Sequence, residues 1–136
     1  MLPLINEAFG WAWLTLGMVA GAALGARFQD ESWLGGYSSW RRRLLRLGHI
    51  AMIALGMLNI LFALSAPRIA LPAPWPSFAG WLMIAGAVLM PLCCALAAID
   101  KRHCRWFPVP VLALLGAGAI TATGLARALF LQGGAP

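Results

Sequence analysis

Four long apolar runs constrain this chain more than any other feature of its sequence. They extend approximately over residues 8–26, 44–66, 78–99 and 107–129, and their few Lys and Arg residues lie only near the run ends. A helix needs about 20 apolar residues to cross the hydrocarbon core of a bilayer, so each run is long enough to span. Lipid offers no hydrogen-bond partner to exposed backbone groups, and the runs lack the alternating pattern of a β-barrel. We therefore expect four transmembrane helices.

The composition agrees with this expectation. Of the 136 residues, 62% are hydrophobic and 10% are charged, whereas an ordinary soluble domain is about half apolar. The length leaves room for one domain only. The sequence predicts an all-α fold with a single transmembrane domain over residues 1–136, an integral membrane four-helix bundle with up-down-up-down topology.

The distribution of basic residues predicts the orientation of the bundle. Eight of the ten Lys and Arg residues fall in the first and third connections, namely Arg27, Arg41, Arg42, Arg43, Arg46, Lys101, Arg102 and Arg105. Basic residues favour the cytoplasmic side, so we expect loops 27–43 and 100–106 in the cytoplasm and both termini outside the inner membrane. The net charge of +6 is attributed to topology and to contacts with the lipid bilayer, and no nucleic acid partner is expected.

A cleaved signal peptide is the alternative interpretation of the first apolar run. Residues 23–25, Ala-Leu-Gly, resemble the small-residue pattern of cleavage sites. However, no Lys or Arg precedes Arg27, and Glu7 is the only charged side chain before it. The run is therefore predicted to be a span.

Small residues at helical spacing predict close contacts between helices. The first run contains Gly17, Gly21 and Gly25, which form a double GxxxG pattern, and the fourth run carries Ala117, Thr121 and Gly124. Such residues let two helix backbones approach closely in lipid. The partner helix belongs either to the same bundle or to another subunit.

His49 is the most informative residue for function, because an ionisable side chain is costly inside a membrane and usually faces the protein interior. It shares one helix face with Met52, Gly56 and Asn59. One hypothesis is an axial ligand of haem b or a hydrogen bond to a quinone, with Arg46 pairing with propionates or anionic headgroups. The alternative is a plain hydrogen bond between helices.

A haem normally takes a second axial ligand, and His103 in the third connection is the only other histidine. A homodimer could instead share one haem between two copies of His49. Copper is not expected at Met90, Cys93 and nearby cysteines, because no CxxC or MxxxM motif accompanies them. All three cysteines are predicted to be free thiols.

Two activity classes are not expected from the motifs. In length and helix number the chain resembles the small multidrug-resistance transporters, but their proton coupling requires a carboxylate inside the first helix, and Glu7 is expected to precede that helix. The sequence also contains no GxSxG, Walker or HExxH motif for hydrolytic or nucleotide chemistry.

The sequence therefore predicts a small multi-pass subunit or assembly protein of a larger membrane complex. Respiratory or electron-transfer complexes are the favoured class, with partner subunits or a homo-oligomer and no catalytic activity of its own. The alternative function is a redox membrane protein that binds haem b or a quinone through His49.

Overall fold

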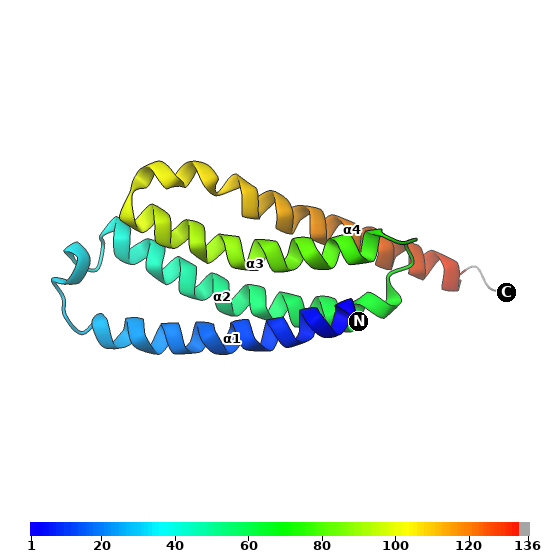
Figure 1. The fold of residues 1–136 in the computed structure, drawn as a ribbon, viewed down its shortest axis with the longest axis horizontal. Helices are drawn as coiled ribbons and strands as arrows, with labels where there is room; N and C mark the ends of the chain where they lie inside the picture. Colours follow the sequence, from blue (N-terminus) through cyan, green and yellow to red (C-terminus); the bar gives the residue numbers. More distant parts are fainter. Residues whose placement is uncertain (134–136) are drawn as a thin grey trace.

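The computed structural model describes residues 1–133 and is all-helical (Figure 1). Its four long helices are α1 (Leu2–Arg27), α2 (Trp40–Ser65), α3 (Trp75–Ile99) and α4 (Pro108–Gly133). Each of them is long and apolar enough to span a membrane. The prediction of an all-α fold with four such helices is confirmed.

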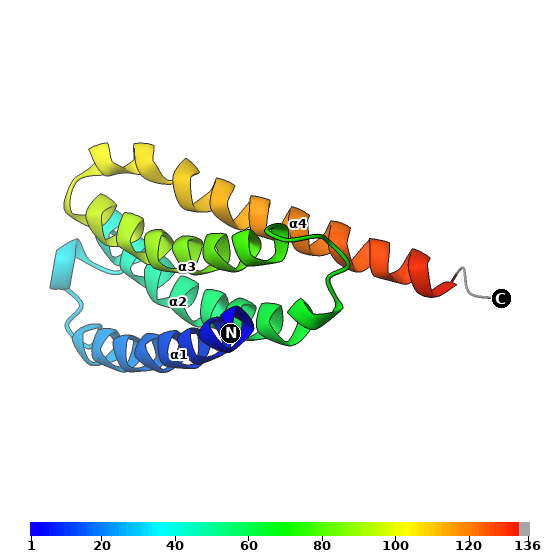
Figure 2. The ribbon, with the colours of Figure 1, turned by 45° about the vertical axis from the view of Figure 1, so that its right-hand side comes forward.

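The helices lie side by side in the order of the sequence. The main contacts of α2 are with α1 and α3, and those of α3 are with α2 and α4 (Figures 1 and 2). The connections 28–39 and 100–107 lie together at one end of the molecule, here called the basic end (Figure 1). The connection 66–74 lies at the opposite end, here called the proline end, where α1 also begins (Figure 1).

Three helices begin earlier than the apolar runs predicted. α1 begins at Leu2 rather than at residue 8, α2 at Trp40 rather than at 44, and α3 at Trp75 rather than at 78. Proline in the first turn has a backbone angle already suited to a helix and starts both α1 and α3. α2 begins after Ser39, whose hydroxyl accepts the Arg42 N–H at 3.3 Å. Hydropathy missed these turns because a helix can continue beyond its apolar part.

Glu7 consequently lies inside α1, so the expectation that it precedes the first helix is wrong. It is half-buried and follows the fully buried Asn6. At a rise of 1.5 Å per residue, Glu7 stands only about 8 Å along the axis from Leu2. The carboxylate therefore belongs to the proline end of the molecule and not to its middle.

α1 packs on α2 with backbone against backbone. A Cβ atom placed on Gly56 would lie 2.9 Å from the carbonyl oxygen of Gly10 and 2.9 Å from the backbone nitrogen of Leu14. Since no real Cβ atom approaches backbone that closely, glycine is required for this contact. Further along α1, a Cβ atom on Gly17 would lie 2.9 Å from the side-chain Cγ1 atom of Ile53 and 3.2 Å from its backbone nitrogen.

The proline end is closed by the connection between α2 and α3. The backbone N–H of Ala70 donates to the carbonyl oxygen of Gly124 in α4 at 3.2 Å. Beside this contact lies an apolar cluster whose buried members are Phe62, Ile69, Ala79, Met83 and Ala117. The connection is thus packed onto α4 and links it to α2 and α3.

Two buried amides join α1, α2 and α3 near the proline end. The Nδ2 group of Asn6 donates to Oδ1 of Asn59 at 2.9 Å and to the carbonyl oxygen of Gly80 at 3.0 Å. Nδ2 of Asn59 donates to the carbonyl oxygens of Leu55 at 2.9 Å and Met83 at 3.4 Å. Both asparagine side chains are 0% exposed. Because a polar group without a partner is costly in an apolar interior, this network holds the three helices in one register.

A double-mutant cycle with Asn6→Ala and Asn59→Ala tests the network. We expect a coupling free energy of about 1 kcal/mol, within the range measured for hydrogen bonds between transmembrane helices. The measurement is reversible unfolding in mixed micelles of a mild detergent and dodecyl sulfate. Thr15→Ala paired with Asn59→Ala is the control, since the Thr15 hydroxyl donates to the Trp11 carbonyl oxygen of its own helix. Equal coupling in the two cycles would contradict the structure.

Candidate functional site

An apolar groove surrounds His49 between α1, α2 and α3. Its volume is about 330 Å³, and its walls are Ala20, Ala23, Leu24, Leu44, Leu45, Gly48, His49, Met52, Pro91, Cys94 and Ala95. The volume is at the lower end of the range for small-molecule sites. His49 stands about 14 Å along α2 from Trp40, deeper than the sequence suggested because the helix starts earlier. The groove therefore opens within the apolar part of the helices.

The His49 ring occupies the space left by a glycine. A Cβ atom on Gly21 would coincide with the imidazole, because the ring atoms Nε2 and Cδ2 are its nearest neighbours. Within residues 1–133, neither ring nitrogen of His49 has a hydrogen-bond partner. The hydrogen bond between helices that was the alternative interpretation is therefore not formed in this part of the chain. The imidazole faces an apolar groove with its hydrogen-bonding capacity unused.

The other residues on the His49 face of α2 divide between different surroundings. Met52 lines the groove together with His49. Gly56 lies against the α1 backbone, and Asn59 belongs to the buried amide network. Arg46 lies 4.4 Å from the centroid of the Tyr37 ring and donates to the Tyr37 carbonyl oxygen at 3.3 Å. The groove therefore contains only His49 and Met52 of these five predicted residues.

His103 is not part of the groove. It lies in the short helix η3 (Lys101–Trp106), which packs on α3 and α4, and its Nδ1 atom is 3.1 Å from the carbonyl oxygen of Asp100. The groove walls come from α1, α2 and α3. A haem held by both histidines of one chain does not fit this arrangement, because the two rings do not face one cavity.

The small residues predicted for helix packing have different neighbours. Gly17 is buried against α2, whereas a Cβ on Gly25 would meet no atom within 4 Å. Ala117 and Gly124 are buried in α4, the former in the apolar cluster and the latter beside Ile69. The Thr121 hydroxyl donates to the Ala117 carbonyl within its own helix at 2.8 Å.

The basic end contains a buried arginine, Arg42, which the sequence suggested only as one of the residues that set the orientation. Arg42 is only 2% exposed. Its guanidinium carbon lies 5.1 Å from the Phe28 ring centroid and 5.6 Å from the Trp33 ring centroid, and Nη2 donates to the carbonyl oxygen of Asp30. Cation–π contacts of this kind favour a desolvated guanidinium. Arg42 therefore fastens the connection 28–39 onto the start of α2.

The carboxylate of Asp30 stabilises the same connection. It accepts hydrogen bonds from the hydroxyl of Ser32 at 2.7 Å and from the Ser32 backbone N–H at 2.9 Å. These bonds, the hydroxyl first, hold the pKa of Asp30 below its usual value. The carboxylate therefore keeps its negative charge near Arg42 to a lower pH than a free aspartate does.

All three cysteines are free thiols, as predicted. Cys93 and Cys94 are buried, and Cys104 in η3 is half-buried. Sequence reasoning missed Asn6 because this residue precedes residue 8, where the first apolar run was taken to begin. It missed Gly10 because this glycine lies outside the GxxxG pattern of Gly17, Gly21 and Gly25. Comparisons with protein-family models, curated proteins and solved structures gave no match.

Proposed function

We propose that this protein is a small multi-pass subunit or assembly protein of a larger membrane complex and acts by helix packing. The observation that carries the proposal is the presence of small residues on helix faces that this chain leaves uncovered. Small residues allow the close backbone approach on which helix association in membranes depends. A face directed only at lipid has no need of them.

The uncovered face of α4 illustrates the argument. Gly118, Ala122 and Ala126 recur every four residues and are exposed, and a Cβ on Gly118 would meet no atom within 4 Å. On α1, Ala8, Ala12, Ala22 and Ala26 are likewise exposed. The four helices lie side by side, with α1 and α4 at the two outer positions. These surfaces would therefore fit helices of other subunits or further copies of this chain. Respiratory or electron-transfer complexes remain the proposed class.

We further propose an up-down-up-down arrangement in the inner membrane with both termini outside. Eight of the ten basic residues belong to the basic end and its two connections. The positive-inside rule favours the cytoplasm for such connections. Tryptophans near both ends of the helices agree with positions at the two membrane interfaces.

Labelling of Cys104 with a membrane-impermeant maleimide tests the orientation, because the other two cysteines are buried. In right-side-out membrane vesicles we expect no labelling of Cys104 until the vesicles are permeabilised. The reference variant combines Cys104→Ser with Arg68→Cys, which places the thiol at an exposed position of the proline end. This reference should label in intact vesicles. Labelling of Cys104 from outside would reverse the proposed orientation.

Photo-crosslinking in the membrane tests the subunit proposal. A benzophenone amino acid at Ala122, on the small-residue face of α4, should give one crosslinked product of defined mass. The control position is Leu61 of α2, which is 55% exposed on a face of large apolar residues and should give little or none. A lone monomer under gentle solubilisation with no crosslink at Ala122 would remove the basis of the proposal.

A quinone-binding function is the second candidate, and the unpartnered imidazole of His49 in an apolar groove favours it. An imidazole N–H can donate to a quinone carbonyl, and apolar side chains from three helices can cover the ring. The groove volume of about 330 Å³ suits a ligand of this size. Haem b is a weaker fit, because His103 lies elsewhere.

His49→Ala tests this second function. Binding of a short-chain ubiquinone analogue, measured by equilibrium dialysis in mild detergent, should weaken about tenfold, as for loss of one hydrogen bond. His103→Ala is the control and should bind as the unchanged protein does. Equal binding by all three proteins would contradict a quinone site at His49.

An absorption spectrum of the same preparation tests haem, since a Soret band lost in His49→Ala would require a haem ligand there.

A further inference from the structure

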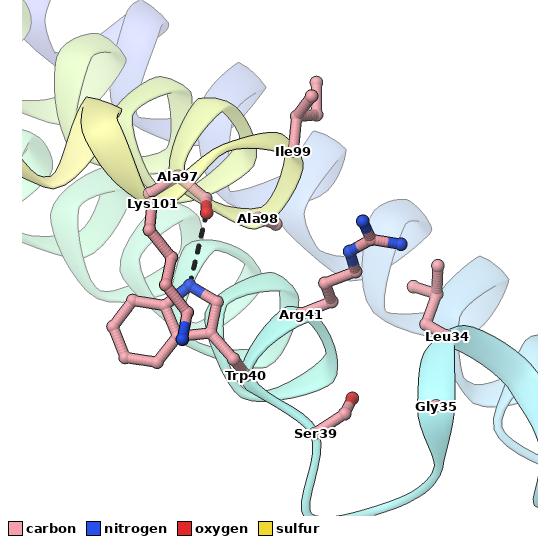
Figure 3. Close-up of a pocket in the computed structure, with 9 residues that line it drawn as sticks. All are labelled: Leu34, Gly35, Ser39, Trp40, Arg41, Ala97, Ala98, Ile99 and Lys101. Carbon is pink, nitrogen blue, oxygen red and sulfur yellow. Dashed lines mark hydrogen bonds between the residues drawn. The ribbon is translucent and has the colours of Figure 1, made fainter.

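We propose that the basic end holds a binding site for the phosphodiester headgroup of an anionic phospholipid, between Arg41 and Lys101. A pocket of about 440 Å³ lies where α2 begins and α3 ends (Figure 3). Arg41 is the second residue of α2, and Lys101 is the first residue of η3. Two cations from distant parts of the sequence therefore border one pocket. This site is separate from the His49 groove and goes beyond the proposed function.

Neither cation is neutralised by a carboxylate. The only ion pair within residues 1–133 joins Arg102 to Asp100, with 4.0 Å between Nε and Oδ2. Asp100 is the nearest acidic neighbour of Lys101 in sequence, and its carboxylate also accepts the Arg102 backbone N–H at 2.9 Å. The Asp100 carboxylate therefore interacts with Arg102. The positive charge of Arg41 and Lys101 is left for a ligand.

Trp40 fixes one wall of the pocket. Its Nε1 atom donates to the carbonyl oxygen of Ala97 at 3.2 Å, which ties the start of α2 to the end of α3 (Figure 3). The Nζ atom of Lys101 lies 5.5 Å from the centroid of the Trp40 ring. Figure 3 shows Lys101 lying over Trp40 on one side of the pocket and Arg41 on the other. Packing on Trp40 therefore positions the charge of Lys101, while the side chain of Arg41 is exposed.

The N-terminus of α2 adds to the positive electrostatic potential at the pocket. Ser39 accepts the backbone N–H of Arg42 through its hydroxyl at 3.3 Å and that of Arg43 through its carbonyl at 3.1 Å. The first two N–H groups of the helix, those of Trp40 and Arg41, have no partner within the helix. A helix start carries partial positive charge, so it adds to the attraction of the two side chains for an anion.

The apolar part of the pocket favours a lipid over a free phosphate ion. Leu34 and Ile99 border the pocket beside the cations, and Ile99 is 74% exposed (Figure 3). A free phosphate would leave these side chains uncovered. The glycerol and first acyl carbons of a phospholipid would cover them, because the pocket lies where two apolar helices end. Basic pockets between transmembrane helices recognise anionic headgroups in this manner.

The chain offers a direct test, because Lys101 is its only lysine. The unchanged protein is placed in nanodiscs of phosphatidylglycerol or of phosphatidylcholine and acylated with an N-hydroxysuccinimide ester. Mass spectrometry then follows the modification of Lys101. We expect phosphatidylglycerol to slow it about fivefold or more. The amino group of Met1 is the internal reference, and its rate should change little.

Affinity measurements identify the residues and the ligand. By native mass spectrometry, R41Q/K101Q should lose about tenfold or more in affinity for phosphatidylglycerol, as for removal of two basic residues beside an anionic headgroup. The matched control R43Q/R105Q removes two exposed charges of the same helices that do not border the pocket and should lose less than about twofold. R41K/K101R keeps both charges and should retain binding.

Three results would overturn the proposal. Equal losses in R41Q/K101Q and R43Q/R105Q would show general charge attraction without a site. Protection of Lys101 by inorganic phosphate, with no difference between the two lipids, would show a site for free phosphate. Equal acylation of Lys101 in both kinds of nanodisc would show that no anionic headgroup lies there. The acylation experiment uses the unchanged protein, so it decides the matter even if R41Q/K101Q fails to fold.

Discussion

The buried pair of Asn6 and Asn59 is the interaction on which the arrangement of the helices depends. An amide N–H group without a partner is costly in an apolar interior, and the Nδ2 groups of the two residues donate to Asn59 Oδ1 and to carbonyl groups of α2 and α3, while Asn6 Oδ1 accepts no hydrogen bond within residues 1–133. This requirement fixes how far α1 can slide along α2. Once the register is fixed, Gly10 faces Gly56 and Gly21 lies beneath His49. The groove at His49 is therefore a consequence of contacts made near the other end of the molecule.

The basic end is organised by aromatic rings. Arg42 is enclosed by Phe28 and Trp33, Arg46 lies on Tyr37, and Lys101 lies on Trp40. An arginine taken out of water needs such partners, because its charge cannot be removed at any ordinary pH. The side chains that remain free of these contacts, Arg41 above all, are then available to ligands. α2 and α3 form walls of both the His49 groove and the pocket at Arg41.

The sequence could predict the class of the fold because hydrophobic length is a local property. It could not predict where the helices begin, since a helix continues through polar residues when a cap such as Ser39 or an early proline supports it. The same limitation hid Asn6, which lay outside the expected first span. The His49 face of α2 was one continuous stripe in the sequence. In space, Met52 stays with His49, while Gly56 and Asn59 serve contacts with α1.

The sequence by itself determined that this protein has four helices able to cross a membrane and that its basic residues gather in two connections. Both follow from composition along short stretches, which needs no knowledge of the rest of the chain. Only the tertiary structure decided which small residues are covered, that Arg42 is buried while Arg41 is not, and that His49 faces a groove. These outcomes depend on pairs of residues far apart in sequence, such as Asn6 with Asn59 and Trp40 with Ala97, whose meeting is fixed by how the helices pack.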